Sequence, residues 1–218
     1  MKIVFISDTH NQHRKLILPS GDVLVHAGDV SGRGSKEEVQ DFLHWFSAQP
    51  FKYKIFIAGN HDFYIQHHAA EFRAMLPSGV IYLEDEMAEV EGVKIWGSPW
   101  TPEYMNWAFM KSHGAKIKEK WDLIPDNIDV LLTHGPMEGM LDQIFSGLSV
   151  GCAALALAVE RINPKYFLFG HIHESYGRQK NGATHFINGA VLNENYELSN
   201  EPVVIDFFDF VGASENRD

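Results

Sequence analysis

The sequence predicts an α/β domain, and three features support this prediction. Short apolar runs such as KIVFI and YKIFI are typical of buried strands. In the first half of the chain these runs alternate with segments of helical periodicity, whereas strands dominate the second half. Asp, Asn or His follows directly on five of the runs, and open α/β sheets bind their ligands at such strand ends.

The first expected strands are 2–7, 22–27 and 53–58. Between the last two, a helix is expected to begin at Ser35, because Ser35 and Glu38 have the spacing of a capping box. Pro50 ends this helix. Its apolar face recurs at helical spacing and is formed by Val39, Phe42, Leu43 and Phe46.

The rest of the chain is expected to contain mainly strands. The expected elements are a helix ending near Met75, short strands within 80–97 with a turn at Glu91-Gly92, a weak helix at 114–123, a strand at 128–133, a helix at 151–162, and strands at 165–169, 184–188 and 203–208. Segment 98–113 is rich in Pro and aromatic residues and receives no assignment. Residues 1–210 are expected to form a single domain, followed by a polar tail at 211–218.

Composition disfavours several classes of function. The net charge of −11 opposes binding to a nucleic-acid polymer, which depends on Lys and Arg side chains that neutralise phosphates. No stretch approaches the ~18 apolar residues of a membrane span. The single cysteine, Cys152, lies in an apolar run and is expected to be a small buried residue, so no disulfide framework is predicted. A cytoplasmic protein is expected, and the oligomeric state stays open.

Five short clusters at strand ends contain the candidate chemistry. They are Asp8-Thr9-His10, Gly28-Asp29, Gly59-Asn60-His61-Asp62, Thr133-His134-Gly135 and Gly170-His171-Ile172-His173. Oxygen and imidazole ligands without thiolate suit Mn, Fe, Zn or Mg. The donors are too numerous for one tetrahedral ion, and they suit two ions about 3.5–4 Å apart that displace a phosphate ester in line.

The order D-x-H, G-D, G-N-H-D, a lone His and G-H-x-H resembles the signature of the calcineurin-like metallophosphoesterase superfamily. The motifs span residues 8–173. The stretches PSGDVLVHAGD, IAGNHD, GSPW and FGHIHESYGR are more narrowly similar to its small metallophosphoesterase-domain-containing branch. The resemblance implies a central two-sheet β-sandwich flanked by helices, an arrangement that the sequence pattern alone does not reveal.

The resemblance also implies two metal sites that share one carboxylate. One ion is held by Asp8, His10, Asp29 and His173, and the other by Asp29, Asn60, His134 and His171. Each motif alone has a simpler interpretation, since Asp8-Thr9 can form a turn or cap and Gly28-Asp29 or Gly59-Asn60 can be plain turns. In a strand-like extension, Asp8 and His10 would point to the same face.

By the same resemblance, His61 is a general acid beside the leaving oxygen, and both Asn60 and His61 contact substrate. Histidine exchanges a proton near neutral pH, which suits protonation of an alkoxide. Asp62 is expected to hold the His61 ring through its other nitrogen. The alternative is a surface histidine followed by an aspartate that caps a helix.

Five aromatic residues fall within segment 96–109: Trp96, Trp100, Tyr104, Trp107 and Phe109. They form either a wall on which a nucleobase stacks or a core beneath an irregular loop. Trp100 follows the turn Gly97-Ser98-Pro99 at a strand end, so it is the first candidate substrate contact, with Tyr104 and Trp107 as further candidates.

The expected function is that of a dinuclear metal-dependent phosphohydrolase. A phosphodiesterase acting on small, cyclic nucleotide-like diesters is favoured, with in-line attack by a hydroxide that bridges the two ions. Manganese is the expected metal, and iron, zinc, cobalt, nickel and magnesium stay open. The alternatives are a phosphomonoesterase and a weakly catalytic scaffold for protein interactions.

Overall fold

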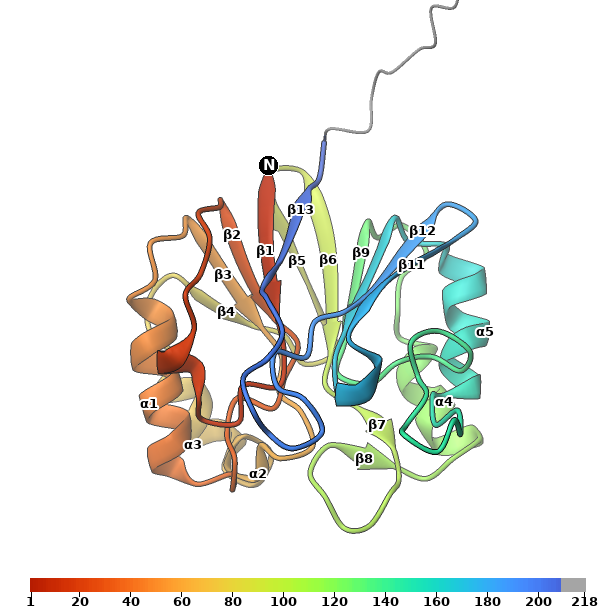
Figure 1. Cartoon of the computed structure of the whole chain (residues 1–218), viewed down its shortest axis with the longest axis horizontal. Coiled ribbons are helices and arrows are strands. Elements are labelled where there is room, and N and C mark those ends of the chain that lie inside the picture. Colours follow the sequence, from red (N-terminus) through yellow and green to blue (C-terminus); the bar gives the residue numbers. More distant parts are fainter. Residues whose placement is uncertain (209–218) are drawn as a thin grey trace, which may run out of the picture.

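The computed structural model describes residues 1–208 and contains two β-sheets that pack against each other (Figure 1). Helices cover the outer faces, with α1 (Lys36–Ser47), α2 (Phe63–His67) and α3 (Ala69–Ala74) on one side and α4 (Ala115–Trp121) and α5 (Ala153–Ile162) on the other. The expected two-sheet sandwich flanked by helices is therefore confirmed. The expected tail at 211–218 lies outside the described residues.

The inner strands of both sheets run parallel, and three of the four described edge strands run antiparallel to their neighbours. Within residues 1–208, the first sheet has the order β13 (Val203–Asp206), β1 (Lys2–Ile6), β2 (Val23–His26), β3 (Tyr53–Phe56) and β4 (Val80–Tyr82). The second has the order β11 (Gly177–Asn181), β12 (Thr184–Asn188), β10 (Tyr166–Phe169), β9 (Val130–Thr133), β6 (Val93–Ser98) and β5 (Glu86–Val90). The antiparallel pairs are β13 with β1, β11 with β12, and β5 with β6.

The inner strands are apolar along their whole length because both of their faces are buried. In β1, Ile3 and Phe5 belong to the core between the two sheets, whereas Val4 and Ile6 belong to the core beneath the helices. Alternate side chains of a strand point to opposite faces, so one strand serves both cores. This explains why a continuous apolar run, and not an alternating one, marks each inner strand.

The capping box at the start of α1 is confirmed. The Ser35 hydroxyl accepts a hydrogen bond from the Glu38 amide at 3.2 Å, and the Glu38 carboxylate accepts one from the Ser35 amide at 3.2 Å. Both bonds satisfy amide groups that a helix end leaves without partners.

Three local details differ from the sequence expectation. The helix expected up to Met75 is broken into α2 and α3 at His68, whose φ of −125° and ψ of 41° are not helical. Segment 98–113 contains a small ribbon of β7 (Thr101–Pro102) and β8 (Met110–Lys111). Strand β11 was not expected, because its sequence GRQKN is polar at an exposed sheet edge.

Within residues 1–208, no helix is both long and apolar enough to cross a membrane.

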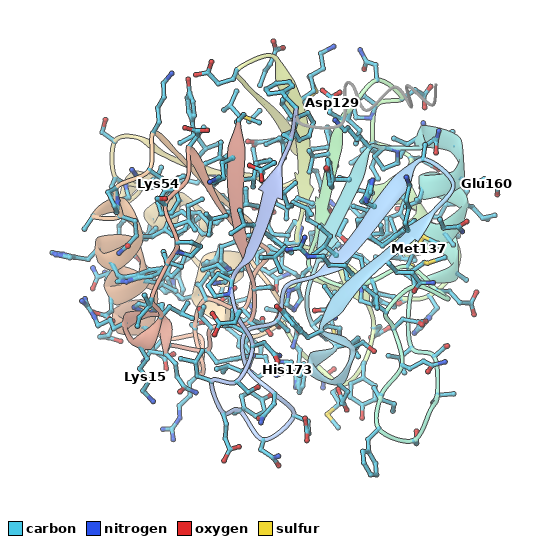
Figure 2. The ribbon with its side chains drawn as sticks, turned by 45° about the horizontal axis from the view of Figure 1, so that its top comes forward. Lys15, Lys54, Asp129, Met137, Glu160 and His173 are labelled. Atoms are coloured by element: carbon cyan, nitrogen blue, oxygen red, sulfur yellow. The ribbon has the colours of Figure 1, made fainter. Side chains whose placement is uncertain are left out.

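The carboxyl ends of the parallel strands lie at one edge of the sandwich. In Figure 2, Asp129, which precedes β9, and His173, which follows β10, lie at opposite edges of the molecule. Parallel pairing puts the segments after β1 and β2 at one edge of the first sheet and those after β9 and β10 at one edge of the second. Hydrogen bonds between the two sheets, such as that between His134 Nδ1 and the Ala27 carbonyl, hold these two edges together. Two short 3-10 turns, η1 (His13–Lys15) and η2 (His173–Ser175), also lie in these segments.

Candidate metal centre

The structure brings all seven expected metal ligands to this edge. Each ligand lies in a segment that directly follows a parallel strand: Asp8 and His10 after β1, Asp29 after β2, Asn60 after β3, His134 after β9, and His171 and His173 after β10. The first five are at most 7% exposed, whereas the last two are half-buried. The side chain of His173 is nevertheless only 9% exposed.

Left-handed backbone conformations orient four of these side chains toward the site. The φ angle is 55° at Asp8, 39° at His10, 55° at Asp29 and 69° at His171. Such conformations cost non-glycine residues on the order of 1–3 kcal/mol each, and they concentrate at functional sites. The expected extended geometry of Asp8 and His10 is therefore wrong, because a turn, and not strand alternation, makes the two side chains converge.

One group of ligands consists of Asp8, His10 and His173, whose ligand atoms lie within 4.8 Å of one another. The His10 Nε2 atom is 3.3 Å from His173 Nε2, and Asp8 Oδ1 is 3.6 Å from His173 Nε2. Two ligands about 2.1 Å from a shared ion, at 90–110°, lie about 3.0–3.4 Å apart. The 3.3 Å separation lies within this range, whereas Asp8 Oδ1 lies 3.6 Å from His173 Nε2 and 4.0 Å from His10 Nε2, so a divalent ion shared by the group would draw this carboxylate slightly inward.

A second group consists of Asp29, His134 and His171, again within 4.8 Å. The Nε2 atom of His134 is 2.7 Å from Asn60 Oδ1 and 3.4 Å from Asp29 Oδ2. The amide oxygen of Asn60 thus lies beside this group, as the sequence resemblance implies.

Asp29 lies between the two groups. Its Oδ2 atom is 3.6 Å from His10 Nε2 and 3.4 Å from His134 Nε2, while its Oδ1 atom accepts a hydrogen bond from the His61 amide at 2.7 Å. One carboxylate oxygen therefore faces ligands of both groups, which is the position that a bridging ligand requires.

Hydrogen bonds behind the ligands fix their orientation. His134 Nδ1 donates to the Ala27 carbonyl at 2.8 Å, and His173 Nδ1 donates to the Asn193 carbonyl at 2.9 Å. Each bond directs Nε2 toward the site, as is usual for metal-binding histidines. His26 accepts from the Gly28 amide at 3.2 Å and contacts the Thr9 hydroxyl at 3.0 Å, so it connects the Asp8 and Asp29 loops.

The electrostatics of the site also fit cations. Oδ1 of the buried Asp8 has no hydrogen-bond partner within residues 1–208. Burial opposes a charge on the His134 ring, but the Asp29 carboxylate outweighs burial and raises the pKa of His134 to about 9. Burial lowers the pKa of His171 to about 4. Divalent ions would displace the proton from His134 and would satisfy the Asp8 oxygen.

The comparison with known proteins agrees with this geometry. The calcineurin-like phosphoesterase family matches residues 1–175. The chain belongs to this family.

Among its relatives is human metallophosphoesterase domain-containing protein 1, which is 38% identical over 94% of this chain and 70% of its own length. A Caenorhabditis elegans protein of the UPF0046 group is 39% identical over 94% of this chain and 60% of its own length. The solved structure of TT1561 from Thermus thermophilus shares the fold, with a TM-score of 0.59 and 14% identity over 87% of this chain and 88% of that one. This calcineurin-like phosphoesterase is thus a metal-dependent phosphoesterase with clustered Asp and His groups that fit divalent ions.

His61 lies beside the ligands, but Asp62 does not hold its ring. The Nδ1 atom of His61 donates to the Gly32 carbonyl at 3.0 Å, so Nε2 is the nitrogen available to substrate. The Asp62 carboxylate is completely buried and accepts hydrogen bonds from the amides of Ser31 at 3.0 Å and Gly59 at 2.8 Å. The expected pairing of Asp62 with His61 is therefore wrong, since adjacent side chains of this turn diverge, and Asp62 instead connects the loops after β2 and β3.

Trp100 does not lie against the ligands either. Its ring is only 8% exposed, packs 5.5 Å from Phe109, and donates from Nε1 to Asp85 at 3.0 Å. Its position agrees with core packing, which is the alternative interpretation, and a contact of Trp100 with substrate stays a prediction. Trp107, a further candidate from the sequence, lies next to the site, with its ring 4.8 Å from that of His61.

Sequence reasoning also missed Tyr196. Its ring lies 4.8 Å from the His10 ring and 5.1 Å from the His173 ring. Nothing near Tyr196 in the sequence resembles a ligand motif, so only its position in the tertiary structure reveals it.

Proposed function

We propose that this phosphoesterase is a phosphodiesterase that hydrolyses small, cyclic nucleotide-like diesters with two divalent ions, manganese being favoured. The observation that carries the proposal is the position of Asp29 between two ligand groups, with His61 beside it. Two bound ions would supply Lewis-acid stabilisation of the phosphoryl oxygens and would lower the pKa of an attacking water. This arrangement suits hydrolysis of a phosphate ester.

The charge balance of the site favours a diester over a monoester. Two divalent ions bring a charge of about +4, and Asp8 and Asp29 bring −2. The attacking hydroxide removes a further charge, which leaves a centre that a monoanionic diester neutralises. A dianionic monoester would carry one negative charge more than this centre neutralises.

His61 is proposed to act as the general acid. The bond from the hydroxide oxygen to phosphorus forms while the bond from phosphorus to the leaving oxygen breaks, and His61 Nε2 gives its proton to that oxygen. The hydrogen bond from Nδ1 to the Gly32 carbonyl holds the ring, and the bond from the His61 amide to Asp29 holds its backbone. Both bonds place the donor beside the shared carboxylate.

The variant His61→Gln tests this role. Its turnover of diesters with alkoxide leaving groups should fall ~10²–10⁴-fold, the usual contribution of a general acid. Hydrolysis of bis(p-nitrophenyl) phosphate should fall much less, because nitrophenolate leaves without a proton. Equal losses on both kinds of ester, with metal content at the wild-type level, would contradict the assignment.

A matched control is His67→Gln, which changes an exposed histidine in α2 and should leave both activities unchanged. Wild-type rates on bis(p-nitrophenyl) phosphate and p-nitrophenyl phosphate, measured with added manganese, separate diesterase from monoesterase activity. Absence of metal and of turnover would favour the scaffold alternative. The proposal includes a small phosphate ester as partner, with no nucleic-acid polymer and no membrane. It also includes a cytoplasmic location.

A further inference from the structure

Aromatic and imidazole rings form a continuous row across the metal centre. The Trp107 ring is 4.8 Å from His61, the His61 ring is 4.7 Å from His10, and the His10 ring is 4.8 Å from Tyr196. Tyr104 extends the row beyond Trp107, at 6.2 Å. The two ends of the row come from distant loops, one between β7 and β8 and the other between β12 and β13.

The rings at the two ends differ from the buried ring of His10 in the middle. His10 is 7% exposed, whereas Tyr196 is 46% and Tyr104 is 63% exposed, and Trp107 is partly exposed. Partly exposed aromatic rings next to a buried polar centre offer faces on which a flat group can stack.

Tyr196 is held in place by its own loop. Its backbone has a φ of 59°, a left-handed conformation that is unusual for a bulky residue. The Tyr196 amide donates to the Asn193 carbonyl at 2.9 Å, and the Gln12 side chain donates to the Tyr196 carbonyl at 2.9 Å. The side-chain oxygen of Asn193 accepts from the amides of Asn195 and Glu197, each at 2.9 Å. These hydrogen bonds maintain the strained backbone of Tyr196, and this backbone conformation keeps its ring against His10 and His173.

We propose that Trp107 and Tyr196 are substrate-contacting walls on two sides of the centre, and that the substrate is a phosphodiester with a flat aromatic group such as a nucleobase. The inference rests on the proposed diesterase function and on the role of His61. Trp107 adjoins His61, so it contacts the leaving group. Tyr196 adjoins His10 and His173 at the other end of the row, so it contacts the group that stays on phosphorus.

Two diesters with the same leaving group test the role of Tyr196. Thymidine 5′-(p-nitrophenyl phosphate) keeps a nucleoside on phosphorus, and methyl p-nitrophenyl phosphate keeps only a methyl group. The wild-type protein should prefer the thymidine ester in kcat/KM by ~5- to 150-fold, the range expected for stacking of one base. Tyr196→Asn should remove this preference, since asparagine tolerates the left-handed backbone but has no ring. Tyr196→Phe should keep it.

The substrate ratio also protects the test from folding defects. Both rates are measured on the same enzyme, so a reduced fraction of folded protein cancels. Phe208→Ala serves as the matched control, because Phe208 is 50% exposed and follows β13 at the opposite edge of the sheets. It should leave the preference unchanged.

Trp107→Leu gives the complementary result. Bis(p-nitrophenyl) phosphate and methyl p-nitrophenyl phosphate share a flat leaving group and differ in the retained one. Trp107→Leu should lower kcat/KM for both esters by a similar factor, whereas Tyr196→Asn should lower only that of the first. If both variants change the two substrates alike, the assignment of the two walls is overturned.

A binding measurement distinguishes failure of this inference from failure of the proposed diesterase function. The affinity of thymidine 5′-monophosphate for the manganese-loaded protein is measured by calorimetry for wild type and Tyr196→Asn. Weaker binding to the variant, together with no turnover of any diester, would refute the diesterase proposal and support the wall. Turnover of methyl p-nitrophenyl phosphate without a preference for the thymidine ester, or with a preference that survives Tyr196→Asn, would refute the wall and leave the diesterase standing.

Discussion

Asp62→Asn tests whether the buried carboxylate connects two ligand loops or serves the acid chemistry of His61. The carboxylate accepts four hydrogen bonds, from the Ser31 amide and hydroxyl on Oδ1 and from the amides of Val30 and Gly59 on Oδ2. An asparagine amide group in the place of Oδ2 would face two backbone donors, whereas in the place of Oδ1 it would face one backbone donor and a hydroxyl that can turn to accept. Each buried donor left without an acceptor costs about 1–3 kcal/mol, so the variant loses about 1–6 kcal/mol from this source.

A second effect opposes this loss at neutral pH. Burial, followed by the Asp29 charge, raises the pKa of Asp62 from 3.8 to about 6. The difference corresponds to about 3 kcal/mol of unfavourable charge burial at pH 7, which asparagine relieves. The net loss of unfolding free energy at pH 7 is therefore at most about 3 kcal/mol.

The two effects separate with pH. Because the folded pKa exceeds the unfolded value of 3.8, the folded protein binds more protons between these values. The contribution of Asp62 to stability is thus present below pH 3.8 and is lost as pH rises through about 6. Asp62→Asn should destabilise the metal-free protein by about 2 kcal/mol more at pH 4 than at pH 7. Urea unfolding in EDTA measures this difference, and a larger effect at pH 7 would refute the reasoning.

Activity provides the second arm of the test. If Asp62 acts by positioning, its substitution shifts Gly59 and the ligands next to it. Asp62→Asn should then reduce turnover of nitrophenyl and alkyl diesters by the same factor. A loss of turnover confined to diesters with alkoxide leaving groups, like that expected for His61→Gln, would indicate that Asp62 acts together with His61.

Two further predictions concern metal content, measured by mass spectrometry together with turnover. Asp29→Asn should lose metal from both sites and nearly all activity, whereas His10→Ala should lose metal mainly from one site, because Asp29 Oδ2 faces both groups. A fully active Asp29→Asn enzyme would exclude a shared ligand. Gly59→Ala should also lose metal, because the added Cβ would overlap the Asp29 carboxylate and lie 2.6 Å from the His134 ring. Its control, Gly32→Ala, should retain metal, because the added Cβ meets its nearest neighbour at 3.4 Å; equal metal content in these two variants would show that the loop after β3 accommodates the Cβ without loss of the site.

The sequence by itself determined the inner strands, the start of α1 and the residues expected as ligands. Buried inner strands are marked by local runs such as KIVFI, and the start of α1 is marked by Ser35 and Glu38, so neighbouring residues suffice to predict them. Once neighbouring strands are parallel, their carboxyl ends share an edge, which places Asp8 near Asp29 and His134 near His171. The packing of the two sheets then brings Asp29 and His134 together.

The tertiary structure alone decided how the side chains are aimed. His10 and His173 are 163 residues apart and yet 3.3 Å apart in space, and left-handed turns bring such ligands together. Asp62 turns away from His61, Trp100 packs in the core, and Tyr196 covers the ligands from a loop with no motif. Each of these outcomes depends on backbone angles and on contacts between distant segments, which local patterns of residues do not encode.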